Sequence, residues 1–295
     1  MEAAAGYDDA DFEEHIARLQ RDGYSVLRSG LSPAEVASTQ AALLALGAQP
    51  EANLHYLYNK GVEFERVYAS QGGQRVHRIA RYFLGDDACL GDVEGRISKP
   101  GGQRQDLHVD GQATGPFQPP PQGDSGLRIT SHMLQLRMIW CLSRFAPGNP
   151  GTTVVVPGSH LIPTLPVPPY PRPDECGIKA EPGDVLLYSS ATYHAFGGND
   201  ATSGEDRLAL LCGWQRSWLW KGWSMPPPAP AVLERAGDAG SKIFGLQIRK
   251  QQERRLGRLS KVPGEGPATM ADALLRAVDF DLDAAIALLR AESRL

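Results

Sequence analysis

The middle of the chain is a series of short apolar or alternating segments that are separated by turns rich in Pro and Gly. The segments are ISKPGGQRQDLHVDG, HMLQLRMIWCLSRF, TTVVVPGSH, DVLLYSS and DRLALLCGWQ. Several short strands with turn residues between them are typical of an antiparallel sandwich or barrel. The pattern therefore predicts a mainly β core over roughly residues 95–220.

Helical patterns precede this core. Residues 9–22 place apolar side chains at helical spacing, and residues 23–31 predict a short strand. Ser32 and Glu35 then form a capping box with Pro at the first helical position, which predicts a helix from there to about Leu46. Residues 76–85 are a further helix candidate.

Helical spacing returns in the C-terminal segment 265–295, which reads as two helices. We find no internal repeat, and we expect one domain over residues 1–295, with an N-terminal helix and strand segment at 8–50.

Composition excludes several classes of partner. The net charge of -4 gives no electrostatic reason to expect nucleic acid or an anionic membrane. The sequence holds no apolar run of membrane-spanning length, and its acidic N-terminus does not resemble a signal peptide. The four cysteines are scattered, without CxxC spacing. We expect a cytoplasmic protein whose partner is a small molecule, with a homodimer left open.

One short motif points to a metal site. In His108-Val109-Asp110, an extended backbone would turn the imidazole and the carboxylate to the same face. His194 lies downstream, beyond several strand candidates, and would complete a triad of two histidines and one carboxylate. Such a triad leaves three positions open on Fe(II) for an oxidant and a co-substrate. HxD alone is common by chance, so the surrounding motifs decide its weight.

Those motifs resemble the phytanoyl-CoA dioxygenase family of Fe(II)/2-oxoglutarate oxygenases. The HxD pair is followed in the family's order by LQLRMIWCLSRFAPGN, NPGTTVVVPGSH, GDVLLYSSATYHAFGGND and an Arg in DRLALLCGW. The resemblance covers roughly residues 10–250 and is strongest over 100–215. It implies a double-stranded β-helix, which is a cupin-like jelly roll, with flanking helices.

The resemblance implies roles for individual residues. His108, Asp110 and His194 would bind iron, and Arg207 would hold the distal carboxylate of 2-oxoglutarate. A planar guanidinium suits a carboxylate because it donates two parallel hydrogen bonds. The alternative for Arg207 is a surface pair with the neighbouring residues Glu205 or Asp206.

Two further residues match positions that contact the co-substrate in the family. They are Gln105 and Thr153, whose side chains can both hydrogen-bond to a carboxylate. Thr152 competes with Thr153 for its role.

Other histidines and aromatic residues receive structural interpretations. We expect Ser159 and His160 to complete a turn, and His77 and His132 to be ordinary hydrogen-bonded or exposed histidines. Trp140 fits a core strand. The Trp-rich segment 214–223 could cover the mouth of the barrel, line a substrate pocket or meet a second subunit, and 111–126 is a long loop of the kind that is often functional.

The implied enzyme is an oxygenase that uses Fe(II), 2-oxoglutarate and O2 and releases succinate and CO2. Related halogenases lack the carboxylate that Asp110 supplies, so hydroxylation is the expected outcome, with desaturation, ring formation or rearrangement left open. The Trp-rich segment and the long loop favour a small, fairly apolar substrate from natural-product biosynthesis.

Three alternatives remain open. One is an acyl-CoA hydroxylase of lipid metabolism, and a second is a non-catalytic jelly-roll binding module. The third is a Zn- or Mn-dependent cupin hydrolase or isomerase, because a triad of this kind does not fix the metal by affinity alone.

Overall fold

The computed structural model describes residues 9–48, 54–110, 133–147, 152–162, 164–200, 202, 204–217, 226–248 and 250. The helices are α1 (Asp9–Asp22), α2 (Pro33–Gly47), α3 (Arg66–Ala69), α4 (Gln71–Leu84), α5 (Pro230–Ala236) and α6 (Gly240–Ile243). The strands are β1 (Tyr24–Leu27), β2 (Cys89–Ser98), β3 (Gln135–Cys141), β4 (Thr153–Val155), β5 (Cys176–Gly177), β6 (Val185–Ser189), β7 (His194–Phe196) and β8 (Arg207–Gln215). Short 3-10 turns connect some of them, such as Leu57–Asn59, Val62–Glu65 and Ser159–Leu161.

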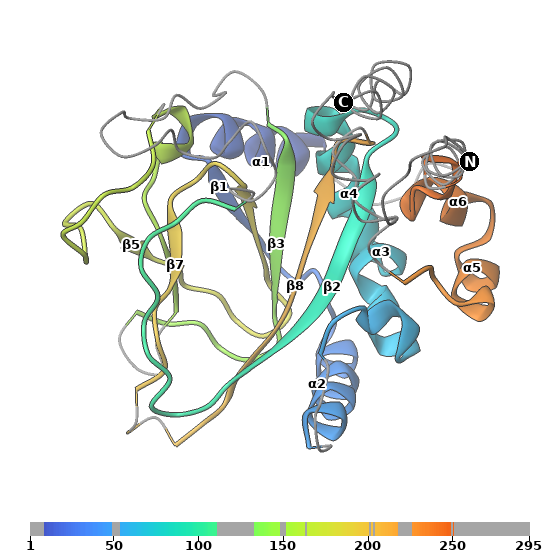
Figure 1. Cartoon of the computed structure of the whole chain (residues 1–295), viewed down its shortest axis with the longest axis horizontal. Coiled ribbons are helices and arrows are strands. Elements are labelled where there is room, and N and C mark those ends of the chain that lie inside the picture. The colour runs from blue at the N-terminus through green and yellow to red at the C-terminus, as the bar shows by residue number, and fades with distance from the viewer. Residues whose placement is uncertain are drawn as a thin grey trace, which may run out of the picture.

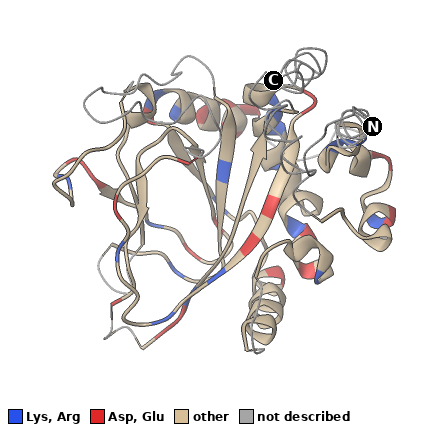
Figure 2. Ribbon diagram, in the orientation of Figure 1, with Lys and Arg blue, Asp and Glu red and all other residues tan. Residues whose placement is uncertain are grey.

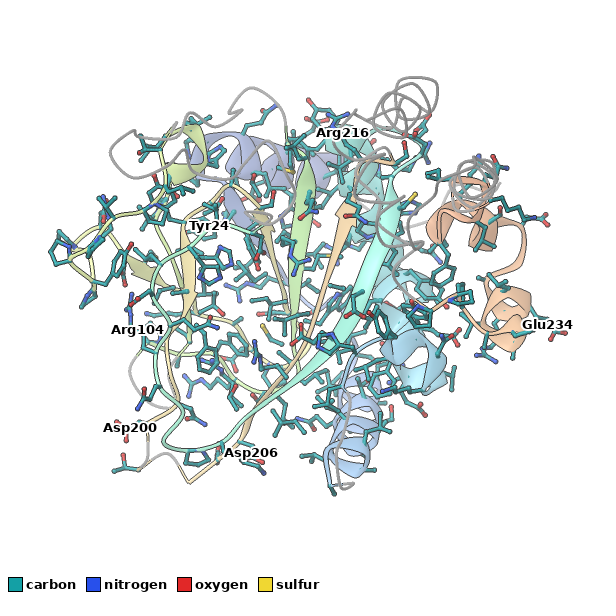
Figure 3. All side chains as sticks on the ribbon, in the orientation of Figure 1. Tyr24, Arg104, Asp200, Asp206, Arg216 and Glu234 are labelled. Atoms are coloured by element: carbon teal, nitrogen blue, oxygen red, sulfur yellow. The ribbon has the colours of Figure 1, made fainter. Side chains whose placement is uncertain are left out.

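The strands form two antiparallel sheets, as a jelly roll requires (Figure 1). The larger sheet has the order β1-β6-β3-β8-β2, and the smaller sheet has the order β5-β4-β7. Helices α1, α2 and α4 contribute apolar side chains to a core on the outer face of the larger sheet. Apolar side chains of both sheets also pack together in part of the space between them (Figure 3). The predicted jelly roll with flanking helices is confirmed.

Strand alternation gives the larger sheet two different faces. On β3, Leu136, Met138 and Trp140 pack into the core that the helices cover. The residues between them, Arg137 and Ile139, face a pocket between the two sheets. Strand β8 alternates in the same way, so a single pattern builds both the core and the pocket wall.

The N-terminal helices follow the prediction closely. Helix α2 begins at the expected capping box, where the Ser32 hydroxyl accepts a hydrogen bond from the Glu35 N–H and the Glu35 carboxylate accepts one from the Ser32 N–H at 2.8 Å. Helix α4 contains the predicted segment 76–85 up to Leu84, but it begins earlier, at Gln71.

The strand predicted over residues 23–31 is shorter than expected. It ends at Leu27, because Asp184 then holds the chain in a turn. The Asp184 carboxylate accepts hydrogen bonds from the Ser29 N–H at 3.0 Å and from the Arg28 guanidinium at 2.5 Å. Ser29 adopts a positive φ of 51°, which a strand does not allow.

Several predictions lie outside the described residues. They are the C-terminal helices in 265–295, the loop 111–126, His132 and most of the Trp-rich segment. Basic and acidic residues are interspersed over helices and strands rather than gathered on one side of the ribbon (Figure 2). Within the described part of the chain, no helix is both long enough and apolar enough to cross a membrane.

Candidate active site

The three residues of the predicted triad meet at β7. The chain around residues 105–110 lies antiparallel to β7, and His108 and His194 exchange two backbone hydrogen bonds of 2.9 and 3.0 Å. The Asp110 N–H donates to the Ser190 carbonyl at 2.9 Å. Possible ligand atoms of His108, Asp110 and His194 all lie within 4.8 Å of one another. The structure therefore brings together the three residues that the HxD motif and the distant histidine suggested.

Each histidine of the triad is oriented by a backbone carbonyl two residues before it. The Nδ1 atom of His108 lies 3.0 Å from the Asp106 carbonyl, and that of His194 lies 3.0 Å from the Thr192 carbonyl. A carbonyl oxygen can only accept a hydrogen bond, so Nδ1 carries the proton in both rings. The Nε2 lone pairs are then available to a metal ion.

The carboxylate of Asp110 is held by two side chains of the larger sheet. Arg137 Nε donates to Oδ2 at 2.9 Å, and the Tyr188 hydroxyl donates to the same oxygen at 3.3 Å. Arg137 and Tyr188 are register partners on β3 and β6. The same Oδ2 atom lies 3.6 Å from His194 Nε2, so the carboxylate faces the imidazole.

Electrostatics favour the protonation states that metal binding needs. Burial lowers the pKa of His194, although Asp110 acts in the opposite direction, so the imidazole stays neutral at neutral pH. Burial acts to raise the pKa of Asp110, but Arg137 and the two histidines outweigh it and hold that pKa below its usual value. The site thus offers a neutral imidazole at His194 and an ionised carboxylate at Asp110.

Arg207 begins β8 and lies at the other end of the same pocket. Its side chain is only 3% exposed, and its guanidinium carbon lies 3.8 Å from the ring centroid of Phe196 and 5.1 Å from that of Phe145. The alternative surface pair with Glu205 or Asp206 is not among the ion pairs of the described residues, and Asp206 pairs with Lys99 at 2.6 Å. Asp206 lies at the outer end of the barrel (Figure 3).

Among the residues that the structure describes, none forms an ion pair with the guanidinium of Arg207. Its Nη1 atom is buried without a hydrogen bond to any described residue. Burial lowers the pKa of Arg207 to about 10, which still leaves it charged at neutral pH. A buried cation without an anion is costly, so this arrangement fits a site that a carboxylate ligand completes.

Thr153 and Gln105 line the same pocket, whereas Thr152 does not. Thr152 donates its hydroxyl to the Ile178 carbonyl at 2.7 Å and is thereby occupied. Thr153 is the register partner of Phe196, and both line the pocket. The Gln105 side chain also reaches the pocket, and its Oε1 accepts from the Phe196 N–H at 3.3 Å. Of the two threonines that the sequence left competing, the geometry thus favours Thr153.

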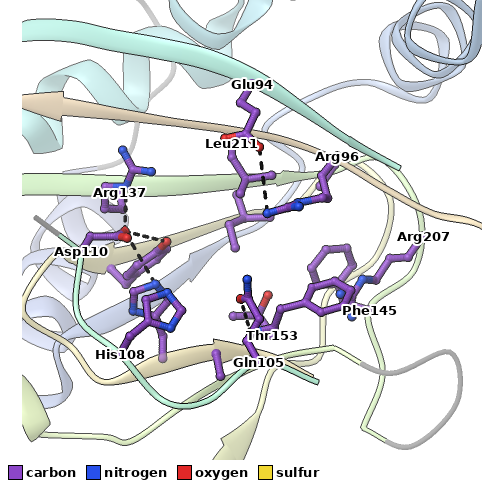
Figure 4. Close-up of a pocket in the computed structure, with 16 residues that line it drawn as sticks. Glu94, Arg96, Gln105, His108, Asp110, Arg137, Phe145, Thr153, Arg207 and Leu211 are labelled. Atoms are coloured by element: carbon purple, nitrogen blue, oxygen red, sulfur yellow. Dashed lines mark hydrogen bonds and ion pairs between the residues drawn. The ribbon is translucent and has the colours of Figure 1, made fainter. Parts of the chain in front are cut away.

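The pocket has a volume of about 170 Å³ and runs from the triad to Arg207 (Figure 4). Its lining is Glu94, Arg96, Gln105, His108, Asp110, Arg137, Ile139, Phe145, Thr153, Tyr188, His194, Ala195, Phe196, Arg207, Ala209 and Leu211. All six site residues singled out in the sequence are among them.

Two tryptophans of the sheet are core residues, as expected for Trp140 but not for Trp214. Trp140 and Trp214 are fully buried on the helix-covered face of the larger sheet. Trp214 stacks on His77, with ring centroids 4.1 Å apart. The expectation that Trp214 could line the pocket is therefore wrong, because β8 alternation turns it to the opposite face.

The turn residues have structural partners. Ser159 donates its hydroxyl to the Val156 carbonyl at 2.6 Å and accepts from the Tyr193 N–H at 2.8 Å. His160 lies 3.1 Å from the Gln20 carbonyl through Nε2 and so connects this turn to α1.

Sequence reasoning missed four charged or polar residues of the pocket, which are Arg137, Tyr188, Glu94 and Arg96. A usable signal existed for Arg137, since it is a charged residue between apolar neighbours of a short strand. A buried charge in such a strand commonly marks a functional position. The position of Arg137 opposite Tyr188 depends on strand register, which the sequence does not reveal directly.

The residues present fit an iron ion and 2-oxoglutarate. Two available imidazole nitrogens and one carboxylate are a donor set that binds Fe(II) and leaves coordination positions open. At the far end, no described residue accepts a hydrogen bond from the buried Nη1 of Arg207, and a carboxylate would supply that acceptor.

Comparison with curated proteins gives a limited match. The chain is 29% identical over 91 residues to an uncharacterised protein of Mycobacterium tuberculosis, which is 31% of this chain and 32% of that protein. The match thus spans about a third of the length of that relative.

Solved structures of similar fold cover a larger share of the chain than this curated relative does. The epimerase SnoN from nogalamycin biosynthesis, in complex with Fe3+, alpha-ketoglutarate and nogalamycin RO, superposes with a TM-score of 0.54 and 21% identity, covering 71% of this chain and 85% of SnoN. EctD from S. alaskensis, with 2-oxoglutarate and 5-hydroxyectoine, has a TM-score of 0.55 and 21% identity, covering 74% of this chain and 79% of EctD. At these identities the similarity shows a shared fold.

The family model of phytanoyl-CoA dioxygenase (PhyH) matches residues 19–208. This range includes His108, Asp110, His194 and Arg207. The chain therefore belongs to the phytanoyl-CoA dioxygenase family, whose members are non-haem iron oxygenases that depend on 2-oxoglutarate.

Proposed function

We propose that this protein is a dioxygenase that hydroxylates an unactivated C–H bond of a small, fairly apolar molecule. The observation that carries the proposal is the buried Nη1 atom of Arg207, which has no hydrogen-bond partner among the described residues and lies in the same pocket as the triad. A cupin hydrolase does not need a carboxylate anchor at that place, whereas a 2-oxoglutarate enzyme does.

Each residue has a distinct task in this proposal. His108, Asp110 and His194 hold the iron, and the carbonyls of Asp106 and Thr192 keep the two imidazoles in the tautomer that binds metal. When bound, iron and 2-oxoglutarate supply the oxidising power, as O2 is consumed and succinate and CO2 are released.

The opposite end of the pocket orients the co-substrate. Arg207 binds its distal carboxylate, and Thr153 of β4 and Gln105, which lies beside Phe196 of β7, add hydrogen bonds. The rings of Phe145 and Phe196 flank the guanidinium and exclude water from it, which strengthens its attraction for the carboxylate. Asp110 occupies the position that halogenases leave to chloride, so hydroxylation is favoured over halogenation.

The substrate assignment rests on the rest of the lining and on neighbouring proteins. Ile139 and Leu211 are register partners on β3 and β8, and they give the pocket an apolar wall. SnoN belongs to nogalamycin biosynthesis, and we propose a natural-product substrate for this chain as well. A screen in which CoA thioesters alone stimulate succinate formation would instead favour an acyl-CoA hydroxylase.

The test is a spectroscopic titration under anaerobic conditions. Wild-type protein with Fe(II) and 2-oxoglutarate should develop the weak visible charge-transfer band of chelated 2-oxoglutarate. The band should disappear in Asp110→Ala and weaken in Arg207→Ala, whereas Arg144→Gln, which alters an exposed arginine outside the pocket, should leave it unchanged. If folded wild-type protein that carries no competing metal gives no band with Fe(II) and 2-oxoglutarate, the assignment moves to a non-catalytic binding module.

A further inference from the structure

Two oppositely charged side chains of β2 face the pocket without a task in the chemistry described above. Glu94 and Arg96 are two residues apart, so they share one face of the strand. Their register partners on β8 are Leu211 and Ala209, which also line the pocket. Since β2 is an edge strand of the larger sheet, this pair lies at the margin of the site (Figure 4).

The pair is only loosely associated. Arg96 Nη2 and Glu94 Oε1 are 3.9 Å apart, beyond hydrogen-bond distance, and the two side chains are 46% and 29% exposed. The other two guanidinium groups of the pocket are more tightly held. Arg137 is bound to Asp110, and Arg207 is enclosed by two phenylalanine rings. Arg96 is therefore the pocket cation that can turn toward an incoming molecule.

The charge of the pocket favours an anion. Among its described lining residues, three guanidinium groups face two carboxylates, which leaves one positive charge when the histidines are neutral. An Fe(II) ion and the dianion of 2-oxoglutarate carry equal and opposite charges, so loading the site leaves that excess in place. A substrate with one negative charge would neutralise it, and a neutral substrate would not.

We infer that the substrate carries a single carboxylate, that Arg96 binds this carboxylate at the margin of the pocket, and that Glu94 opposes its binding. The inference rests on the proposed function, which places the metal and the co-substrate. The carboxylate end of the substrate lies against Arg96, and its apolar carbon skeleton lies against Ile139 and Leu211, which face the interior. Arg96 therefore determines specificity and is not part of the machinery that holds iron or 2-oxoglutarate.

The test compares monocarboxylic acids with their neutral esters. Wild-type protein is loaded anaerobically with Fe(II) and 2-oxoglutarate, and its charge-transfer band is recorded first, which tests the proposed function alone. Phenylacetate, mandelate and tropate are then titrated in parallel with their methyl esters. Binding is measured by the shift of the band, and uncoupled succinate formation is measured after air is admitted.

Two neighbouring substitutions should change acid binding in opposite directions. Arg96→Gln should weaken the binding of the acids about tenfold, because a charge-assisted contact is lost. Glu94→Gln should strengthen the binding of the acids about threefold, because it removes a part-exposed carboxylate that repels theirs. The affinity for 2-oxoglutarate should change less than about twofold in both variants, since Arg207 holds that ligand. Arg144→Gln is the control for loss of a surface charge.

Three results would overturn the inference while the band of wild type is present. The first is that the esters bind as well as the acids, and the second is that none of the three acids binds. The third is that Arg96→Gln weakens the binding of 2-oxoglutarate rather than that of the acids, which would make Arg96 part of the co-substrate site. Absence of the band itself would instead contradict the proposed function.

Discussion

Replacement of Arg207 by Met should separate co-substrate binding from the stability of the fold. The guanidinium is enclosed, so its hydrogen bonds to a carboxylate are shielded from solvent. A hydrogen bond to a charged group contributes about 1.5–3 kcal/mol, and a bidentate contact makes two of them. The loss of about 3–4 kcal/mol corresponds to a 2-oxoglutarate affinity that is about 100- to 1,000-fold weaker.

The same substitution should have little effect on the apoprotein. Contacts of the guanidinium with Phe196 and Phe145 stabilise the fold by about 1–2 kcal/mol in total. The buried Nη1, which finds no acceptor among the described residues, costs about 1–3 kcal/mol, so the two contributions nearly cancel. The free energy of unfolding should therefore change by no more than about 1 kcal/mol, whereas removing one partner of a buried ion pair costs about 3–5 kcal/mol.

The assay pairs calorimetric titration of 2-oxoglutarate into the Mn(II)-loaded protein with denaturant unfolding of the apoprotein. Arg207→Lys serves as the matched variant, because it keeps the charge and loses the planar fork, and it should retain more affinity than Arg207→Met. An affinity for 2-oxoglutarate that falls less than about tenfold in Arg207→Met would refute the anchoring role. An apoprotein destabilised by about 3 kcal/mol or more would show instead that Arg207 has an internal partner.

Three further predictions follow from individual contacts. Asp110→Ala should reduce the affinity for Ni(II), measured by calorimetry, by more than about 100-fold. Loss of a metal ligand should cost more than loss of a residue that only hydrogen-bonds to a ligand. An unchanged affinity would exclude the triad. Thr153→Val should weaken the binding of 2-oxoglutarate about tenfold and leave the stability unchanged. Thr152→Val loses the hydrogen bond to the Ile178 carbonyl, so it should cost about 1 kcal/mol of stability and leave the affinity unchanged. Equal behaviour of the two variants would contradict the strand alternation. Burial lowers the pKa of His77 from 6.5 to about 4, so the unfolded state binds the proton more readily and stability should fall by about 2.5 kcal/mol as the pH drops from 6.5 to 4. Unfolding curves of His77→Phe should lack this part of the stability loss at low pH. An identical pH dependence in wild type and variant would count against a buried neutral His77.

Local sequence signals predicted the parts of the fold that local interactions determine. The capping box of Ser32 and Glu35 was predictable because its two hydrogen bonds join residues three positions apart. The strand at 23–31 was predicted too long, because its end is set by Asp184, a residue that is distant in the sequence. Contacts between distant segments are invisible to a reading of local pattern.

The same limit applies to the candidate site. Its HxD motif is local, and the family resemblance pointed to His194 and Arg207. What the sequence could not provide is the environment of these residues, such as the Arg137 contact to Asp110 or the phenylalanine rings around Arg207. Those contacts arise from the register of β3 and β8 and from the meeting of two sheets.

Strand register connects stability and function in this protein. On β8, Leu208 and Leu210 enter the helix-covered core, whereas Arg207 and Ala209 line the pocket. A slip of one residue would turn the leucines into the pocket and bury the guanidinium among apolar side chains, which is strongly unfavourable. The apolar pattern that stabilises the core therefore also fixes Arg207 at the far end of the pocket from the triad. Substitutions that loosen the helix-covered face of β8 should consequently weaken co-substrate binding without touching the site itself.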